Sequence, residues 1–313
     1  MPSFDKINYS LRPSKTIERA LAFEGTQQLR TAMNLIDPVY IGFGSIWFTD
    51  FQIAHKLLGI RDLISIEGDA IGYARACFNA PYKTVRVRNQ LSSDALPDLY
   101  ADGSINSRPW IVWLDYDDIL TQIAVDDIRS VIENAPTNSL LLVTLDVSED
   151  DYGKPKDRRE LLKSLLGTVV DDELEREDFD ERLPETIGSL LTGFMTSAAV
   201  ASGRPGGFVP AFDMVYRDTA TMLTVGGVLP TVGTVPAVRE VVGSPAWPGI
   251  VRQRILAPHL TVKEAATLQA ELPSARRLTR AKVRRLGFDL ADEQLAAFER
   301  YYRYFPSFAQ VSF

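Results

Sequence analysis

The chain has 313 residues, of which 45% are hydrophobic and 24% charged, and its formal net charge is −7. This length allows one large α/β domain with additions, or two modest domains. The negative charge argues against a protein built to wrap nucleic acid, and the single cysteine, Cys77, excludes an internal disulfide and a cysteine-cluster metal site. No apolar run approaches the roughly 20 residues that span a bilayer, and the first residues lack a signal-peptide pattern, so we expect a cytoplasmic protein without membrane contact.

A helix is predicted near the start of the chain. Apolar residues recur there at helical spacing (Ile17, Leu21 and Leu29). Pro13 suits the first helical turn, and Ser14 is a candidate cap. The same segment carries basic side chains that either reach over a cleft to a carboxylate or phosphate, or pair along the helix with Glu18 and Glu24. These basic residues are Arg12, Lys15 and Arg19.

After this helix, short apolar strands alternate with helical patterns. Strands are predicted at residues 39–43, 62–69, 83–90, 110–118 and 139–147, helices at 48–59, 70–79 and 119–135, and a short helix or turn at 92–100. Continuous apolar strands separated by helices are typical of a parallel sheet that is covered on both faces. Right-handed crossovers then predict a doubly wound, mostly parallel α/β sheet.

The second half of the chain changes character. Residues 148–185 are rich in charge and indicate exposed helices or a mobile insertion with a solvated face. After a helix at 186–201, residues 208–230 predict two adjacent strands, which suit an antiparallel hairpin at the edge of the sheet. From residue 249 onward we expect helices, one of which begins with the capping-box pair Thr261 and Glu264. The expected parts are an N-terminal helical segment (1–36), an α/β domain (37–248) and a helical C-terminal appendage (249–313).

The stretch VYIGFGS ends the first strand with two glycines. Gly42 and Gly44 let the backbone turn sharply and place no side chain between the main chain and a ligand. Ligands of doubly wound sheets bind at the carboxyl ends of the strands, so we expect an adenosine cofactor over this turn. Its polar tail would meet the free amides at the start of the next helix, and Ser45 adds a hydroxyl.

Acidic residues follow the next two strands at the same edge of the sheet. Glu67 is placed to accept hydrogen bonds from ribose hydroxyls, which the spacing from the glycine turn favours over a solvated strand-end acid, and Asp69 is an alternative partner. After the third strand, Asp94, next to Ala95, either accepts a hydrogen bond from the adenine amine or caps a short helix. These residues would complete the adenosine site.

Three acids follow the most apolar strand, in WLDYDDIL. Asp115 is expected to lie nearest the pocket, where it orients the acceptor or an amine, or acts as a base if its pKa is raised. Tyr116 lies beside it. Asp117 and Asp118 are expected to cap the following helix, so that only Asp115 faces the site.

The order of these motifs resembles the class I S-adenosylmethionine-dependent methyltransferases. In that superfamily a glycine-rich turn follows the first strand, acids follow the second and third, and an acidic motif ends the fourth. The matching stretches are VYIGFGS, LISIEGD, SSDAL and WIVWLDYDD, and the resemblance covers roughly residues 37–230. The stretches YSLRPSKTIER, GFGSIWFTDFQIAHKLLGI and IVWLDYDD also resemble bacterial proteins described as O-methyltransferases of unknown substrate.

This resemblance implies a Rossmann-like fold, S-adenosylmethionine as cofactor, and methyl transfer to an oxygen or nitrogen acceptor. It implies catalytic roles for Asp115 and Tyr116. The cofactor-binding residues that it implies are Gly42, Phe43, Gly44, Ser45, Glu67, Asp94, Ala95 and Asp115. The fourth-strand motif is not Asn-Pro-Pro-Tyr, so methylation of base amino groups is not supported, and Asp146 is followed by Val147, so no metal site is predicted.

Two other functions remain open at this point. A nicotinamide dehydrogenase also uses Gly-x-Gly and a distal acid, but its third glycine position is Trp47 here. A catalytically inactive scaffold or cofactor-sensing protein could instead use the C-terminal helical region to contact a protein partner. The basic stretch 276–285 is expected to be a solvated helix face rather than a nucleic-acid contact.

Overall fold

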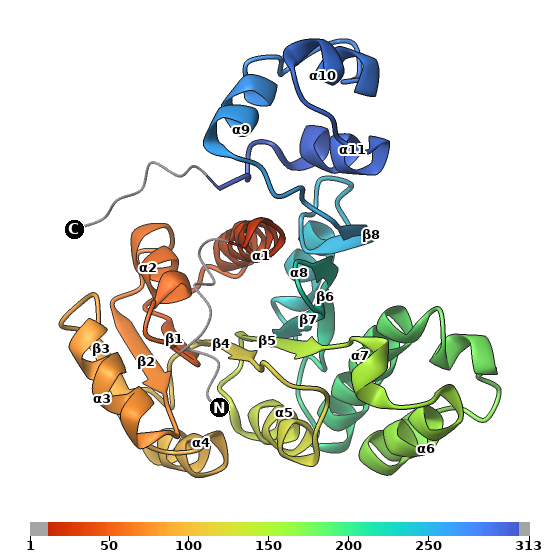
Figure 1. Cartoon of the computed structure of the whole chain (residues 1–313). Coiled ribbons are helices and arrows are strands. Elements are labelled where there is room, and N and C mark those ends of the chain that lie inside the picture. Colours follow the sequence, from red (N-terminus) through yellow and green to blue (C-terminus); the bar gives the residue numbers. More distant parts are fainter. Residues whose placement is uncertain (1–11, 307–313) are drawn as a thin grey trace.

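Eight strands form one sheet in the computed structural model, which describes residues 12–306 (Figure 1). The strands are β1 (Val39–Gly42), β2 (Asp62–Ile66), β3 (Val85–Arg88), β4 (Trp110–Asp115), β5 (Ser139–Asp146), β6 (Val209–Arg217), β7 (Thr221–Leu229) and β8 (Ile250–Ile255). Their spatial order is β3-β2-β1-β4-β5-β7-β6-β8. The first five are parallel, β7 runs antiparallel to β5 and β6, and β8 is parallel to β6. The predicted doubly wound sheet with its antiparallel hairpin is confirmed.

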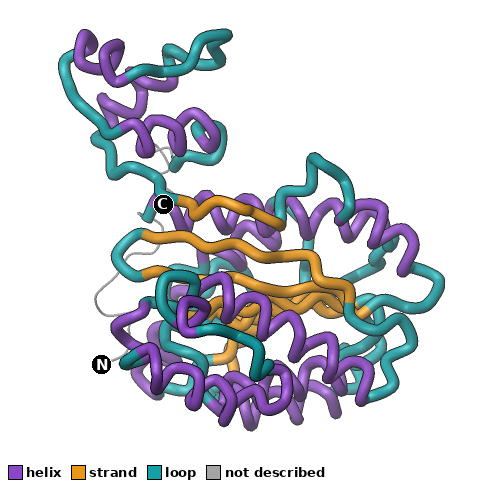
Figure 2. The backbone as a smooth tube through the Cα atoms, turned by 90° about the vertical axis from the view of Figure 1, so that its right-hand side faces the viewer, coloured by secondary structure: helices purple, strands orange, loops and turns teal. Residues whose placement is uncertain are grey.

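Helices cover both faces of this sheet, as the views along and across the strands show (Figures 1 and 2). One face carries α1 (Pro13–Ala32), α2 (Thr49–Lys56), α3 (Ala70–Asn79) and α8 (Val235–Val242). The other face carries α4 (Ser92–Ala101), α5 (Gln122–Asn134), α6 (Pro155–Leu166) and α7 (Leu183–Ala201). Among the described residues, no helix combines the length and the apolar character needed to cross a membrane.

Strand β4 shows why the central strands are apolar without alternation. Trp110, Val112 and Leu114 pack into the core on the α4–α5 face. Ile111 and Trp113, between them, pack into the core beneath α1. Because successive side chains of a strand point to opposite faces and both faces are covered by helices, the five positions from Trp110 to Leu114 are all apolar, and only Asp115 at the end of the strand is polar.

Helix α1 is capped by a side chain from the turn between β6 and β7. Arg12 is its N-cap residue and provides no side-chain cap, and Pro13 occupies the first turn. The amides of Ser14 and Lys15 instead donate to the carboxylate of Asp218, each at 3.0 Å, in the turn between β6 and β7. A carboxylate is stabilising at a helix N-terminus because it satisfies free amides and faces the positive end of the helix dipole. The prediction that Ser14 caps this helix is therefore wrong.

The charged segment 148–185 folds against α5 and α7 as short helices. These are α6 together with η3 (Glu149–Tyr152), η4 (Gly167–Val169) and η5 (Arg176–Phe179). Leu162 and Phe179 are buried in the core on that face. The buried guanidinium of Arg158 donates to the carbonyl groups of Glu149, Gly153 and Phe179. The segment thus packs an apolar face against the core, which the sequence analysis did not predict because charged residues dominate its composition.

The last part of the chain begins with a strand, not with a helix. Residues 250–255 form β8 at the edge of the sheet, which corrects the expectation that everything after residue 249 is helical. Helices α9 (Val262–Gln269), α10 (Arg280–Leu286) and α11 (Asp292–Tyr301) follow, and the predicted capping box of Thr261 and Glu264 is confirmed. The Tyr304 hydroxyl donates to Glu24 of α1 at 2.6 Å, which ties this region to the sheet-covering helices. The proposed three-part division of the chain stays a prediction.

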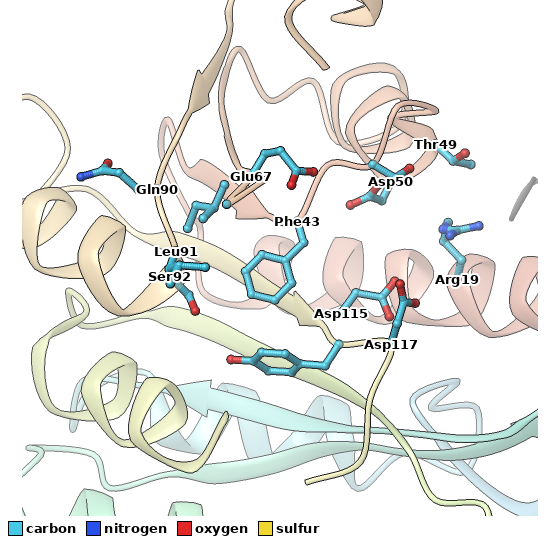
Figure 3. Close-up of a pocket in the computed structure, with 14 residues that line it drawn as sticks. Arg19, Phe43, Thr49, Asp50, Glu67, Gln90, Leu91, Ser92, Asp115 and Asp117 are labelled. Carbon is cyan, nitrogen blue, oxygen red and sulfur yellow. The ribbon is translucent and has the colours of Figure 1, made fainter. Parts of the chain in front are cut away.

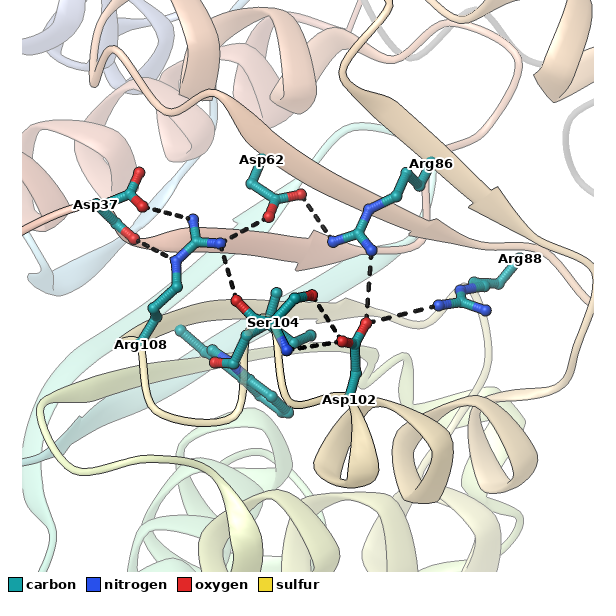
Figure 4. Close-up of polar contacts among 9 residues, drawn as sticks. Asp37, Asp62, Arg86, Arg88, Asp102, Ser104 and Arg108 are labelled. Atoms are coloured by element: carbon teal, nitrogen blue, oxygen red, sulfur yellow. Dashed lines mark hydrogen bonds and ion pairs between the residues drawn. The ribbon is translucent and has the colours of Figure 1, made fainter.

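A polar network connects the amino ends of the strands, opposite the edge where ligands are expected (Figure 4). The Asp62 carboxylate accepts hydrogen bonds from Arg86 and from Arg108, both at 2.8 Å. Asp102 lies 3.5 Å from Arg86, and Asp37 lies 3.2 Å from Arg108. Because these side chains are partly exposed, each pair contributes modestly, and the network serves mainly to join β2 and β3 to the loop before β4.

Candidate active site

A cavity of about 330 Å³ opens at the carboxyl ends of β1, β2 and β4 (Figure 3). The strand order reverses between β1 and β4, and doubly wound sheets bind ligands at such a point. The lining residues are Arg19, Phe43, Ser45, Thr49, Asp50, Ile66, Glu67, Gly68, Gln90, Leu91, Ser92, Asp115, Tyr116 and Asp117.

The glycine turn contributes Phe43 and Ser45 to this wall, but not its glycines. A methyl group on Gly44 would lie 2.3 Å from the Ser65 hydroxyl oxygen, and one on Gly42 would lie 3.1 Å from the Trp113 carbonyl oxygen. Both glycines therefore allow β1 to pack closely against β2 and β4. The structure does not bring Gly42 or Gly44 to the cavity, and their direct contact with a cofactor stays untested.

The turn that follows is tightly packed and carries a strained residue. Phe48 is fully buried and adopts a left-handed backbone conformation with φ of 48°, which is unusual for a residue other than glycine. Its neighbour Trp47 is exposed and is not among the residues that line the cavity. Neither Trp47 nor Phe48 therefore fills the cavity.

Glu67 lies at the end of β2 and faces the cavity (Figure 3). One of its oxygens accepts the amide of Asp69 at 3.0 Å, and burial raises the pKa of Glu67 above its ordinary value. Asp69, the alternative ribose partner, caps α3 by accepting the amide of Gly72 at 2.7 Å. The geometry therefore favours Glu67 over Asp69 as the residue available to a ligand.

The connection after β3 reaches the cavity through residues that the sequence analysis did not select. Gln90, Leu91 and Ser92 line it. Asp94 is exposed in the first turn of α4, and Ala95 is buried in the core beneath that helix. The structure does not bring Asp94 or Ala95 to the cavity.

Asp115 at the end of β4 lines the cavity and is held from behind by α1. The Lys15 ammonium lies 2.9 Å from one carboxylate oxygen of Asp115 and 3.6 Å from Glu18. It also lies 5.3 Å from the ring centre of Trp113. Burial alone would lower the pKa of Lys15, but Asp115 and Glu18 raise it well above its ordinary value. Lys15 is therefore a buried cation that orients the Asp115 carboxylate.

Tyr116 lines the cavity with its ring and turns its hydroxyl elsewhere. The hydroxyl donates to Asp127 of α5 at 2.7 Å, and Asp127 also accepts a hydrogen bond from Ser92. Burial and the neighbouring Asp127 carboxylate raise the pKa of Tyr116 well above its ordinary value. The ring packs edge-on against Phe43 with 5.1 Å between centres. This arrangement suits a wall residue rather than a proton acceptor.

The remaining acids of the motif do not cap α5 as expected. Thr121 is the N-cap and accepts the amide of Ala124. Asp117 lines the cavity instead, and Asp118 accepts the amide of Ile119 at 2.8 Å. The expectation that only Asp115 of this motif faces the site is therefore wrong, because Asp117 faces it too. Within the described residues, no group of three or more His, Cys, Asp or Glu side chains is placed to hold a metal ion.

The family can be assigned from the whole chain. A family model described as "Putative O-methyltransferase" matches residues 7–313. The chain belongs to this family. The resemblance to O-methyltransferases seen in the sequence is thereby confirmed, and no curated protein matches the chain.

Solved structures that resemble this family member do so only distantly. One is Trm1 from Pyrococcus horikoshii in complex with S-adenosyl-L-methionine, with 10% identity, 72% of this chain and 58% of that chain covered, and a TM-score of 0.44. Another is an O-methyltransferase from Bacillus cereus in complex with SAH, with 11% identity, coverages of 66% and 80%, and a TM-score of 0.39. Likenesses at this distance do not tell what the present chain binds.

Two features of this O-methyltransferase family member were missed or left open in the sequence. Asp50, in the first turn of α2, accepts a hydrogen bond from the Tyr40 hydroxyl at 2.6 Å, and burial raises its pKa. Arg19 of α1 lines the same end of the cavity. Asp50 could have been selected from the sequence, because it comes just after the glycine turn. Arg19 could not, because only the packing of α1 determines which of the early basic residues faces the cavity.

Proposed function

We propose that the chain transfers a methyl group from S-adenosylmethionine to an oxygen or nitrogen acceptor. The observation that carries this proposal is the convergence of Glu67 from β2, Gln90 from the end of β3 and Asp115 from β4 on one cavity where the strand order reverses. Membership in the O-methyltransferase family supports the same reaction.

The residues around the cavity suit an adenosine group with a charged tail. Glu67 has one oxygen engaged by a backbone amide and offers the other to ribose hydroxyls. The apolar side chain of Leu91 and the amide of Gln90 are placed to contact adenine, a role that the sequence analysis gave to Asp94. Phe43 would pack against the ligand between these residues and Asp115, as its central position in Figure 3 indicates.

The chemistry asks mainly for positioning. When bound, the cofactor supplies a methyl group on a positively charged sulfonium. The chain has to hold this group in line with the acceptor atom and keep the two close, which is the larger part of the rate gain in such a transfer. Lys15 engages one carboxylate oxygen of Asp115, so we assign the other oxygen to attracting positive charge on the ligand. The hydroxyl of Tyr116 is engaged by Asp127, so we assign its ring to the cavity wall.

Calorimetry with S-adenosylhomocysteine tests this proposal. The chain is expected to bind it, and Glu67→Ala is expected to weaken binding roughly 10-fold to 100-fold, because a hydrogen bond to a charged group contributes about 1.5–3 kcal/mol. Glu240→Ala, which removes an exposed carboxylate of α8, is the matched control and should leave the affinity unchanged. Binding of NADH instead would indicate a dehydrogenase, and binding of neither would indicate a scaffold.

A further inference from the structure

Arg19 is a buried cation in the wall of the cavity. It lies on the cavity side of α1, one helical turn after Lys15, and only 5% of it is exposed. Its Nε has no hydrogen-bond partner, and its guanidinium forms no ion pair with any residue between positions 12 and 306. Leaving a buried donor unsatisfied is unfavourable by about 1–3 kcal/mol, so such a group in a cavity wall is suited to an acceptor that a ligand supplies, and its charge favours an anionic one.

Neighbouring Lys15 cannot take the same role. Its ammonium is already held by Asp115 and Glu18, and it does not line the cavity. Among the residues of the described part of the chain that line the cavity, Arg19 alone carries a positive charge. An anion that enters this space therefore meets one cation.

The surroundings of Arg19 contain charges of both signs. Figure 3 shows Arg19 beside Asp115 and Asp117 and below Asp50, with Gln90 at the opposite end of the cavity. Arg19 acts on Asp50 through space and lowers its pKa, against the larger effect of burial, which raises it. A ligand group that carries both a carboxylate and an ammonium would match this end of the cavity.

A second feature at this end also favours a negative group. Helix α2 begins at Thr49, which lines the cavity, and its N-cap residue Phe48 offers no side-chain acceptor; of the amides in the first turn, that of Asp50 is engaged by its own carboxylate and the others are free of a side-chain cap. These amides and the helix dipole attract anions. The guanidinium and the helix start therefore act on the same region.

We infer that Arg19 binds the α-carboxylate of the amino-acid tail of the cofactor, while the acids that end β4 face its ammonium group. This inference rests on the proposed function and adds a specificity: the site recognises the zwitterionic tail and discriminates against adenosyl thioethers that lack the carboxylate. Glu67 and Gln90 at the other end would bind both kinds of ligand equally.

The test compares S-adenosylhomocysteine with its decarboxylated analogue by calorimetry on the full chain. The unchanged protein should bind S-adenosylhomocysteine at least about 10-fold more tightly than the analogue. Arg19→Gln should abolish this preference while leaving the affinity for the analogue within about threefold, which also shows that the variant is folded. Arg19→Lys should keep part of the preference because it retains the charge.

Arg61→Gln is the matched control, since it removes an exposed cation just before β2 and should leave the preference intact. A preference that survives Arg19→Gln overturns the inference, and so does an equal loss of affinity for both ligands. If the unchanged protein binds the analogue as tightly as S-adenosylhomocysteine, the inference fails while the proposed function stands. If it binds neither ligand, the proposed function fails as well.

Discussion

The substitution Gly44→Ala tests whether the glycine turn is shaped by packing within the protein. The added methyl carbon would lie 2.3 Å from Ser65 Oγ, 2.8 Å from Phe48 Cε1 and 3.0 Å from Ser65 Cβ. Ser65 and Phe48 are fully buried, so neither can turn into solvent. Overpacking is unfavourable by about 1–3 kcal/mol, and the lower chain entropy of alanine offsets about 0.4–1 kcal/mol of this. We therefore expect the free energy of unfolding to fall by about 1–2 kcal/mol.

Urea denaturation followed by circular dichroism measures this change. Gly103→Ala is the control, because a methyl group there meets nothing within 4 Å, and its effect should stay within about 0.5 kcal/mol. Ser65→Gly removes two of the three atoms closest to the added methyl group. In a protein that carries Ser65→Gly, the further change Gly44→Ala should therefore lower the free energy of unfolding by less than it does in the unchanged protein. If Gly44→Ala is as stable as Gly103→Ala, the reasoning about the turn is refuted.

Three further predictions concern other parts of the molecule. Lys15→Met should lower the free energy of unfolding by about 3 kcal/mol in the same denaturation assay, because it leaves the fully buried Glu18 and the partly exposed Asp115 without their cation. Burial raises the pKa of Glu67, so calorimetry should show that affinity for S-adenosylhomocysteine falls as the pH drops through that raised pKa and the carboxylate is lost. Tyr304→Phe should lower stability by about 0.5–1 kcal/mol, because it removes a partly exposed hydrogen bond to Glu24. Burial and Glu24 raise the pKa of Tyr304 to about 12, so this contribution is present below pH 10 and is lost as the pH rises from about 10 to about 12.

Each of these predictions has its own control. Lys56→Met removes an exposed lysine of α2 and should change stability little, and a loss below about 1 kcal/mol in Lys15→Met would contradict the role of the buried pair. Burial also raises the pKa of Asp50 in the cavity wall, so Asp50 could cause a similar pH dependence. If Glu67 is the cause, the affinity of Glu67→Gln for S-adenosylhomocysteine should no longer fall as the pH drops. For Tyr304, equal stability of the protein and of Tyr304→Phe from neutral pH to about pH 12 would show that the hydrogen bond contributes nothing.

The sheet was predictable because its central strands are buried on both faces, and such strands read as apolar runs. β8 escaped prediction for the opposite reason. It lies at the edge of the sheet and carries Arg252 and Gln253 as exposed residues, so the sequence IVRQRI shows no apolar run. Its assignment depends on pairing with β6, and the partner strand is not visible in local composition.

The site was predictable where strand ends alone determine which residues meet. Glu67 and Asp115 follow directly from the parallel sheet, and the structure places both at the cavity. The orientation of Tyr116 depends on Asp127, which lies on the next helix and gives no local signal. Asp94 could not be distinguished from a solvated residue, because the orientation of α4 about its own axis decides which of its residues face inward.

Lys15 and Arg19 stand four residues apart and therefore point from the same side of α1. Any shift of this helix therefore moves Lys15 relative to Asp115 at the end of β4 and moves Arg19 relative to the cavity. A protein shortened to begin at β1 would keep all eight strands and lose both. The helix that precedes the first strand in the sequence thus forms, in three dimensions, one wall of the cavity.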